Sequence, residues 1–229
     1  MNSKYSNFLT ILLVVIIIAI VGIIGFLGYR YYETYIMKNN SEDFVDTFLD
    51  ETSKKDNTND QQGENNVVDD DGSMFDGVDE GTNTGGTSST GKKKQYNGFD
   101  MDGTIEIPAT GLKCPILAQS EYSPKALETS VVILYGVGLN QVGNTTIAGH
   151  NYRNGLFFSN NKKLKVGDKI YITDTTGKRL AYTIYDKFEA EENYSDYMTR
   201  DTGGAIEISL STCTDDSKAR LIILARADV

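Results

Sequence analysis

Residues Phe8 to Leu27 form an almost unbroken aliphatic run near the start of the chain. About 20 apolar residues in a helix match the hydrocarbon thickness of a bilayer, so this run predicts a membrane span. The bulky sequence Tyr29-Arg-Tyr-Tyr32 follows it, whereas a cleavable signal peptide ends in small residues. We therefore expect an uncleaved anchor over residues 8–29, with interfacial tyrosines and a short cytoplasmic tail over residues 1–7.

The flanking charges leave the orientation of this anchor open. Lys4 and the amino group precede the run, and Arg30 and Lys38 follow it, so the positive-inside rule sets two charges against two. The shortness of the N-terminal tail favours an arrangement with the rest of the chain outside the membrane.

The net charge of −10 belongs to one tract. Residues 39–90 carry fourteen acidic side chains against two lysines, whereas residues 91–229 carry seventeen of each sign. A nucleic-acid-binding domain needs clustered basic residues, and this distribution offers none. Residues 30–96 are expected to form a stalk and then an acidic, low-complexity linker that is too polar to bury a core. The run Asp69-Asp-Asp71 is better explained as part of this solvated linker than as a calcium site.

The start of the linker has one further pattern. Phe44, Val45, Phe48 and Leu49 fall on one side of a helix if the anchor helix continues from Tyr31 to about Asp50. A juxtamembrane stalk is the simplest interpretation of that pattern.

The folded domain is expected to cover residues 97–229. It contains about eight short, alternating segments, with a hairpin turn at Asp174-Thr-Thr-Gly177 and one short helix over Pro124–Thr129. Many short strands with little helix predict a mostly β fold that closes into a barrel.

The last two strands carry the first candidate residues. Side chains alternate along a strand, so Cys213 leaves the strand 206–213 on the polar face, together with Glu207 and Ser209. We expect the apolar face to meet the core and the polar face to point toward water or a cleft. Arg220 begins the next strand, which is apolar throughout and should be buried on both faces. This arrangement predicts a reactive thiolate beside a fixed positive charge.

The single histidine of the chain, His150, stands at the end of another strand, beside Gly149. Each of His150, Cys213 and Arg220 taken alone is usually structural. Together they supply a nucleophile, a base and an electrophilic group, which is what thiol catalysis needs. Cys114 is expected to be a packed strand residue, and both thiols to be free. Asp215 and Asp216 fit a solvated loop better than the acid of a triad.

Two motifs resemble the signatures of the sortase family. Leu210-Ser-Thr-Cys213-Thr, followed seven residues later by Arg220, is similar to the family's Leu-X-Thr-Cys…Arg pattern, and Thr146-Ile-Ala-Gly-His150-Asn is similar to its histidine segment. Ala126-Leu-Glu and Leu134-Tyr-Gly-Val-Gly also fit, so the resemblance covers residues 97–229. It implies an eight-stranded β-barrel, and a membrane-anchored cysteine transpeptidase of Gram-positive bacteria with its catalytic domain outside the cell. The subclass stays open. The pilin-polymerising type often has a second membrane span, and because no second span is obvious in this sequence, the chain is less similar to that type.

The resemblance also implies roles and partners. Cys213 would attack the Thr–Gly carbonyl of a Leu-Pro-X-Thr-Gly-like sorting signal, His150 would exchange the proton, and Arg220 would hold the oxyanion. The donors would be surface proteins that carry a C-terminal sorting signal. The acceptor would be an amine of peptidoglycan or of a pilin-like protein. Candidate substrate-binding residues are Thr212, Thr214 through its N–H, and Tyr194, Tyr197 and Met198 in a predicted loop over 188–204.

No cofactor is expected. The sequence has no cluster of cysteines and histidines that would hold zinc. Calcium is conceivable at Glu189, Glu191, Glu192 and Asp196, but a solvated charge run explains these residues better. Two alternatives remain open: a membrane-tethered β-barrel that only binds, in which Cys213 is inert, and a cysteine protease that uses water as acceptor. Dependence of the product on added amine separates the protease from the transpeptidase.

Overall fold

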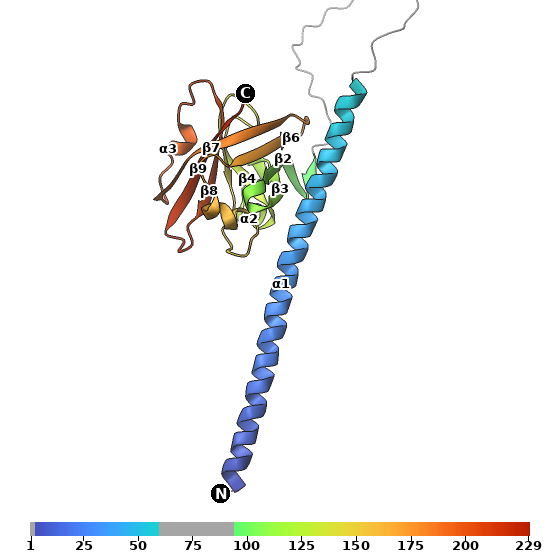
Figure 1. The fold of residues 1–229 in the computed structure, drawn as a ribbon, viewed down its shortest axis with the longest axis vertical. Helices are drawn as coiled ribbons and strands as arrows, with labels where there is room; N and C mark the ends of the chain where they lie inside the picture. Colours follow the sequence, from blue (N-terminus) through green and yellow to red (C-terminus); the bar gives the residue numbers. More distant parts are fainter. Residues whose placement is uncertain (1–2, 60–93) are drawn as a thin grey trace, which may run out of the picture.

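The computed structural model describes residues 3–59 and 94–229 (Figure 1). Helix α1, Ser3–Asn59, runs for 57 residues from the apolar run through the predicted stalk. Within the described ranges it is the one helix long and apolar enough to cross a membrane, over Phe8–Lys54. The predicted linker between residues 60 and 93 lies outside the described residues, and the expectations for it, Asp69–Asp71 included, stay predictions.

The domain that follows consists of short strands with a few helical turns. The strands are β1 (Gln95–Tyr96), β2 (Phe99–Ile107), β3 (Leu112–Leu117), β4 (Val131–Gly136), β5 (Gly143–Ala148), β6 (Lys169–Asp174), β7 (Arg179–Glu191), β8 (Ile206–Cys213) and β9 (Ala219–Ala227). The α-helices are α2 (Pro124–Thr129) and α3 (Asp196–Thr199), and the 3-10 helices are η1 (Pro108–Thr110), η2 (Gln119–Glu121) and η3 (Phe158–Lys163). Ser123 caps α2 by accepting a hydrogen bond from the Ala126 N–H, with Pro124 in the first turn.

The strands close into a barrel. They follow the order β1-β2-β3-β4-β5-β8-β9-β7-β6, and β6 pairs back onto β2. Because β1 pairs with β2 outside this ring, the barrel itself has the eight strands β2–β9. Its interior is filled by aliphatic side chains from alternate positions, including Ile105, Ile147, Leu210 and Ile223, all fully buried. The predicted eight-stranded, mostly β barrel with short helices is confirmed.

Two connections place the candidate site. β5 and β8 are parallel neighbours, so their carboxyl ends lie at the same edge of the sheet. β8 and β9 are antiparallel neighbours joined by a short loop, so the end of β8 lies beside the start of β9. His150, Cys213 and Arg220 follow or occupy these three strand ends, which brings residues 70 positions apart in sequence to one rim of the barrel.

The segment 188–204, which the sequence indicates as a loop, is partly regular. β7 continues to Glu191 because it pairs with β9 as far as Glu191↔Ala219. Outside the barrel, Phe188 and Tyr197 pack on Ile222 and Leu224 of β9. This apolar contact accounts for the extra strand residues and for the short helix α3. It also confirms that β9 is buried on both faces.

The polar face of β8 is covered, which corrects the expectation that it meets water. The exposed fractions of Glu207, Ser209 and Ser211 are 2%, 0% and 6%, whereas Cys213 at the end of the strand is only partly buried. The segment around α3 lies over this face, and its hydroxyl and guanidinium groups bond the buried side chains. Alternation in sequence reports the two faces of a strand, but it does not report what covers each face.

Candidate active site

Cys213 and Arg220 are cross-strand partners at the rim. They stand opposite each other in the β8–β9 register, and the Arg220 Nη1 donates a hydrogen bond to the Cys213 Sγ at 2.5 Å. The loop between them is closed by a hydrogen bond from the Thr214 N–H to the Ala219 carbonyl, 2.9 Å long. The contact pairs a candidate nucleophile with a cation, which is a combination that thiol catalysis uses.

A carboxylate holds the other side of the guanidinium. The Arg220 Nη2 donates to the Glu192 Oε1 at 2.6 Å, from the turn just after β7. The side chain of Glu192 is 73% exposed and that of Arg220 is 28% exposed. The rigid fork of the arginine therefore contacts the thiol with one nitrogen and an anion at the surface with the other.

His150 lies at the same rim because β5 and β8 leave the sheet together. Ala148 pairs with Ser211, the Gly149 N–H bonds the Ser211 carbonyl at 3.1 Å, and the Asn151 Nδ2 bonds the Cys213 carbonyl at 3.0 Å. These contacts lie on both sides of His150 in sequence and tie its segment to the cysteine strand. The structure thus brings all three predicted catalytic residues to one place.

The surroundings of His150 favour its neutral form. Its ring stacks on Tyr152 with 4.7 Å between centroids, and burial lowers the pKa of the imidazole, opposed by the negative charge of Glu128. A methyl group on Gly149 would lie 2.8 Å from atoms of both Phe158 and Val131. Glycine is therefore needed for the close approach that sets the direction of the histidine segment.

The two aspartates of the β8–β9 loop form hydrogen bonds with the loop and with neighbouring side chains. Asp215 accepts from Lys162 at 2.5 Å and from Asn151 at 3.0 Å, and Asp216 accepts from the Thr214 hydroxyl at 2.7 Å. These hydrogen bonds lower the pKa of each carboxyl. The contacts stabilise the loop, and the expectation that neither residue serves as the acid of a triad stays a prediction.

Cys114 lies elsewhere, in the barrel interior. Its exposed fraction is 2%, it forms no disulfide, and burial raises the pKa of its thiol to about 12. The thiol stays protonated and packed at neutral pH, as a structural cysteine does.

Four of the candidate substrate-binding residues have clearly different environments. Thr212 is buried on the interior face of β8, and its hydroxyl has no hydrogen-bond partner among the described residues. The Thr214 N–H is already bonded to the Ala219 carbonyl, which corrects the expectation that it is free to bind an oxyanion. Tyr197 is buried, with its hydroxyl 3.2 Å from that of Ser211, whereas Tyr194 is 41% exposed.

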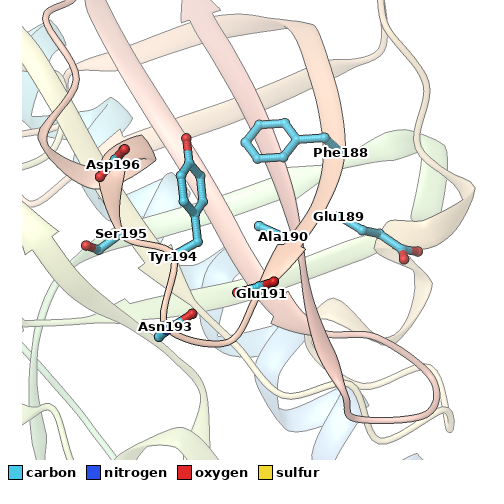
Figure 2. A pocket seen from close by; sticks show the side chains of 8 residues that line it. All are labelled: Phe188, Glu189, Ala190, Glu191, Asn193, Tyr194, Ser195 and Asp196. Atoms are coloured by element: carbon cyan, nitrogen blue, oxygen red, sulfur yellow. The ribbon is translucent and has the colours of Figure 1, made fainter.

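Tyr194 lines a surface pocket of about 510 Å³ beside β7. Figure 2 shows its ring opposite that of Phe188, and the two ring centroids lie 6.3 Å apart. The remaining lining residues are Glu189, Ala190, Glu191, Asn193, Ser195 and Asp196. Because Ala190 pairs with Arg220, this pocket adjoins the candidate site. Among the residues 3–59 and 94–229, three or more acidic, histidine or cysteine side chains never gather in a geometry that holds a metal.

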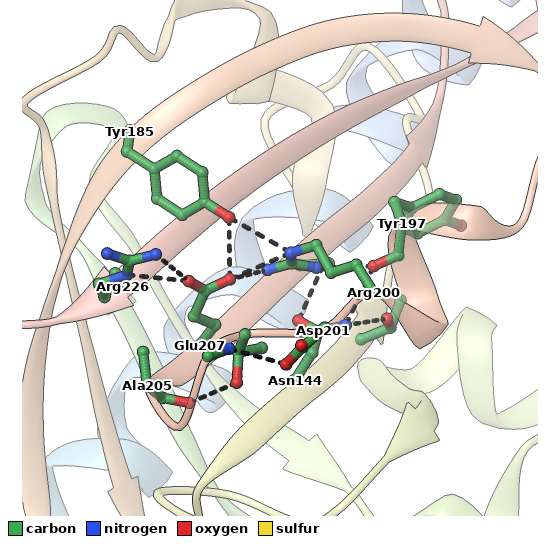
Figure 3. A network of polar contacts seen from close by, with 12 residues as sticks. Asn144, Tyr185, Tyr197, Arg200, Asp201, Ala205, Glu207 and Arg226 are labelled. Carbon is green, nitrogen blue, oxygen red and sulfur yellow. Dashed lines mark hydrogen bonds and ion pairs between the residues drawn. The ribbon is translucent and has the colours of Figure 1, made fainter.

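A buried ionic network behind the pocket was not anticipated from the sequence (Figure 3). Glu207, 1% exposed in its side chain, accepts from Arg200, from Arg226 and from the Tyr185 hydroxyl at 2.8 Å. Arg200 also donates to the Tyr197 carbonyl at 2.6 Å and to the Ser209 hydroxyl at 2.7 Å. Burial acts to raise the pKa of Glu207, but the hydrogen bonds from Tyr185, Arg226 and Arg200 outweigh it, and the pKa is lowered.

This network ties α3 to the strand that ends in Cys213. Asn144 of β5 adds hydrogen bonds to the carbonyls of Tyr197 and Met198. The one sequence signal for this network was Glu207, an acidic residue at an alternating position of the strand. Alternation alone placed its side chain on the face expected to meet water.

Comparison with known proteins agrees with the motifs. The sortase domain family model matches residues 105–228, which is more than half of the chain. The chain belongs to the sortase family. It is 30% identical over 130 residues to sortase A of Bacillus anthracis, a match that covers 53% of this chain and 57% of that relative.

Solved structures resemble this sortase over the barrel. A Clostridium perfringens sortase D5 transpeptidase superposes with a TM-score of 0.51 at 27% identity, covering 57% of this chain and 80% of that one. Corynebacterium diphtheriae sortase A gives a TM-score of 0.52 at 26% identity, covering 57% of this chain and 62% of that one. The family gives the fold but not the subclass, and the chain spans just over half of the length of its curated relative.

Proposed function

We propose that this sortase cleaves a Leu-Pro-X-Thr-Gly-like sorting signal between Thr and Gly and transfers the acyl group to an amine. The hydrogen bond between Arg220 and Cys213 carries the proposal. It places a cation where it favours the thiolate and where negative charge grows on the carbonyl oxygen under attack. The nearby His150 supplies the proton transfer that acyl exchange requires.

In the first half-reaction the Cys213 sulfur attacks the threonine carbonyl carbon. A C–S bond forms and the C–N bond to glycine breaks, while the thiol proton passes by way of the His150 imidazole to the leaving amine. The Arg220 guanidinium stabilises the oxyanion of the tetrahedral intermediate. The product is a thioacyl-enzyme and a released peptide with a free amino group.

In the second half-reaction the acceptor amine attacks the thioester carbon. A new C–N bond forms, the C–S bond breaks, and the amine proton passes through His150 back to the Cys213 sulfur. His150 thus acts as acid and base in turn, which suits an imidazole that is neutral at rest. Tyr194 and the pocket beside β7 form a wall that contacts the signal.

We place the catalytic domain, residues 97–229, outside the cell on an anchor over residues 8–29. The exposed aliphatic surface of α1 and its length support the span. The donors are surface proteins with C-terminal sorting signals, and the acceptors are amines of the cell wall or of another protein.

The test uses the full chain in detergent micelles, because α1 packs on the barrel and its removal would expose buried residues. The protein is incubated with a Leu-Pro-X-Thr-Gly peptide library and then with triglycine, and mass spectrometry follows both enzyme and product. We expect an acyl adduct on Cys213 that triglycine removes, present in Cys114→Ala and absent in Cys213→Ala. A confirmed free thiol without any adduct would indicate a binding module, and a product unchanged by triglycine would indicate a hydrolase.

A further inference from the structure

The stalk portion of α1 is docked against the barrel. Figure 1 shows one helix that passes from the apolar N-terminal part along the side of the domain. Val45 and Phe48 are 0% and 2% exposed, and Phe48 packs with Met101, Leu117 and Val132 on the outside of the barrel. The contact buries the apolar stripe that the sequence assigned to a simple stalk.

Polar contacts fix where along the helix the barrel sits. The Ser41 hydroxyl donates to the Lys113 carbonyl at 3.2 Å, and the Lys113 ammonium pairs with Asp46 at 2.7 Å. More than one helical turn further along α1, Glu51 pairs with Lys94 at 2.9 Å. The Lys94 ammonium also lies 4.3 Å from the centre of the Phe48 ring. Exposed ion pairs are individually weak, so the apolar contact holds the helix and the pairs define its register.

The same contacts show where the chain on either side of the acidic segment 60–93 is held. The chain leaves α1 at Asn59, and its next described residue, Lys94, is bonded to Glu51 on the same helix. Both ends of the segment are therefore held at α1. The distance between the barrel and the anchor is therefore set by the contacts of α1 with the barrel, whatever the length of this segment.

Helix geometry then gives the height. Twelve residues separate Tyr29, the end of the expected span, from Ser41, the first residue bonded to the barrel. At 1.5 Å per residue the docked region begins about 18 Å beyond the span along the helix axis.

The histidine side of the barrel faces this part of α1. Tyr152, Asn154 and Leu156, which follow His150, line one wall of a groove of about 1240 Å³, and α1 residues 29–40 line the other. The residues that follow His150 therefore lie on the side of the barrel that faces α1.

We propose that α1 is a rigid strut that holds the catalytic rim at a fixed height above the membrane, and that it matches the enzyme to substrates retained in that same membrane. The inference rests on the proposed function, because it concerns how the signal-bearing donor reaches Cys213. The contacts that carry it are those of Val45, Phe48, Lys113 and Lys94.

The test lifts the barrel without turning it. Seven helix-forming residues inserted between Tyr32 and Glu33 add about 10 Å and rotate the helix to within about 20° of two full turns. The matched control inserts the same seven residues after Gly72, in the acidic segment. Both variants and the wild type are reconstituted into lipid vesicles with a donor whose signal sits on its own membrane helix through a helical spacer. A free signal peptide is the second donor, and triglycine is the acceptor.

We expect the α1 insertion to lower transfer from the membrane-held donor by roughly tenfold or more, since a mismatched tether loses effective concentration. Transfer from the free peptide stays unchanged, and the control insertion changes neither rate. Inserting the same seven residues into the donor's spacer restores the rate with the lengthened α1. Equal losses from both insertions, or no loss from the α1 insertion, overturn the strut. An inactive wild type on the free peptide instead contradicts the proposed function.

Discussion

Cys213 and Arg220 occupy opposite positions of the β8–β9 ladder, and their side chains are in direct contact. Their spacing of seven residues is what a short closed loop between two antiparallel strands requires. The register fixes the guanidinium because the backbone on both sides of the loop is hydrogen-bonded. Under the proposed mechanism the pair is preorganised for transition-state charge, which is the condition under which a hydrogen-bond donor contributes most to catalysis.

Replacing Arg220 by lysine tests this preorganisation. The charge remains, but lysine cannot contact Cys213 and Glu192 at once with a planar fork. We expect kcat for transfer to fall about 100-fold or more, as on loss of an oxyanion donor, with a smaller effect on KM. Steady-state kinetics with the free signal peptide measure both. Arg179→Lys, at an ion pair with Glu106 at the opposite end of β7, is the control. Wild-type kcat in Arg220→Lys would show that charge alone suffices.

Glu192→Gln tests whether the negative charge beside Arg220 matters for catalysis. Glu192 is largely exposed, and exposed ion pairs contribute about 0–1 kcal/mol. We therefore expect kcat to change by at most about fivefold, far less than for Arg220→Lys. Glu121→Gln, in η2 and outside the pocket beside β7, is the control in the same assay. A loss as large as that of Arg220→Lys would mean that Glu192 takes part in the reaction itself.

The titration of His150 can be followed directly because the chain has a single histidine. Burial lowers its pKa and Glu128 opposes the shift, so removing that negative charge should lower the pKa further. We expect NMR titration to place the wild-type pKa below about 6.5, and that of Glu128→Gln lower still. The acidic limb of the pH–rate profile, which reports neutral imidazole, should move the same way. Glu121→Gln is the control, and an upward shift in Glu128→Gln would contradict the assignment.

The sequence predicts the barrel and its three rim residues because local patterns carry both. Alternation locates the strands, and the spacing of Cys213 and Arg220 is itself the hairpin register. Such patterns do not predict that Glu207 is buried, because the groups that cover it come from β7, β9 and the segment after α3. The docking of Phe48 was also missed, because helical periodicity shows that a stripe exists without showing what it meets.

The network around Glu207 should make stability depend on pH. Its folded-state pKa is lowered, so its contribution is present above the unfolded value of about 4.3 and is lost as pH falls through the folded value. We expect Glu207→Gln to lower the free energy of unfolding at pH 7, and the difference from wild type to shrink below pH of about 4.3. Urea unfolding at several pH values measures this. Glu189→Gln, on the exposed side of β7, should show no such dependence, and a constant difference for Glu207→Gln would contradict the role of its charge.

Docking of α1 can be tested by placing a charge in its contact. Phe48→Asp buries a carboxylate among Met101, Leu117 and Val132 and removes the ring beneath Lys94, so the stalk should detach from the barrel. Loss of a buried phenylalanine side chain costs about 3–5 kcal/mol. Hydrogen exchange followed by mass spectrometry should then show lost protection over residues 41–52 and unchanged protection in β8 and β9. Thr47→Asp, one residue earlier on the exposed side, should keep the wild-type pattern.

Transfer from a free signal peptide should be retained in both variants, because the contacts among Cys213, Arg220 and the His150 segment do not involve α1. Retained protection over 41–52 in Phe48→Asp would show that the helix is held by other contacts.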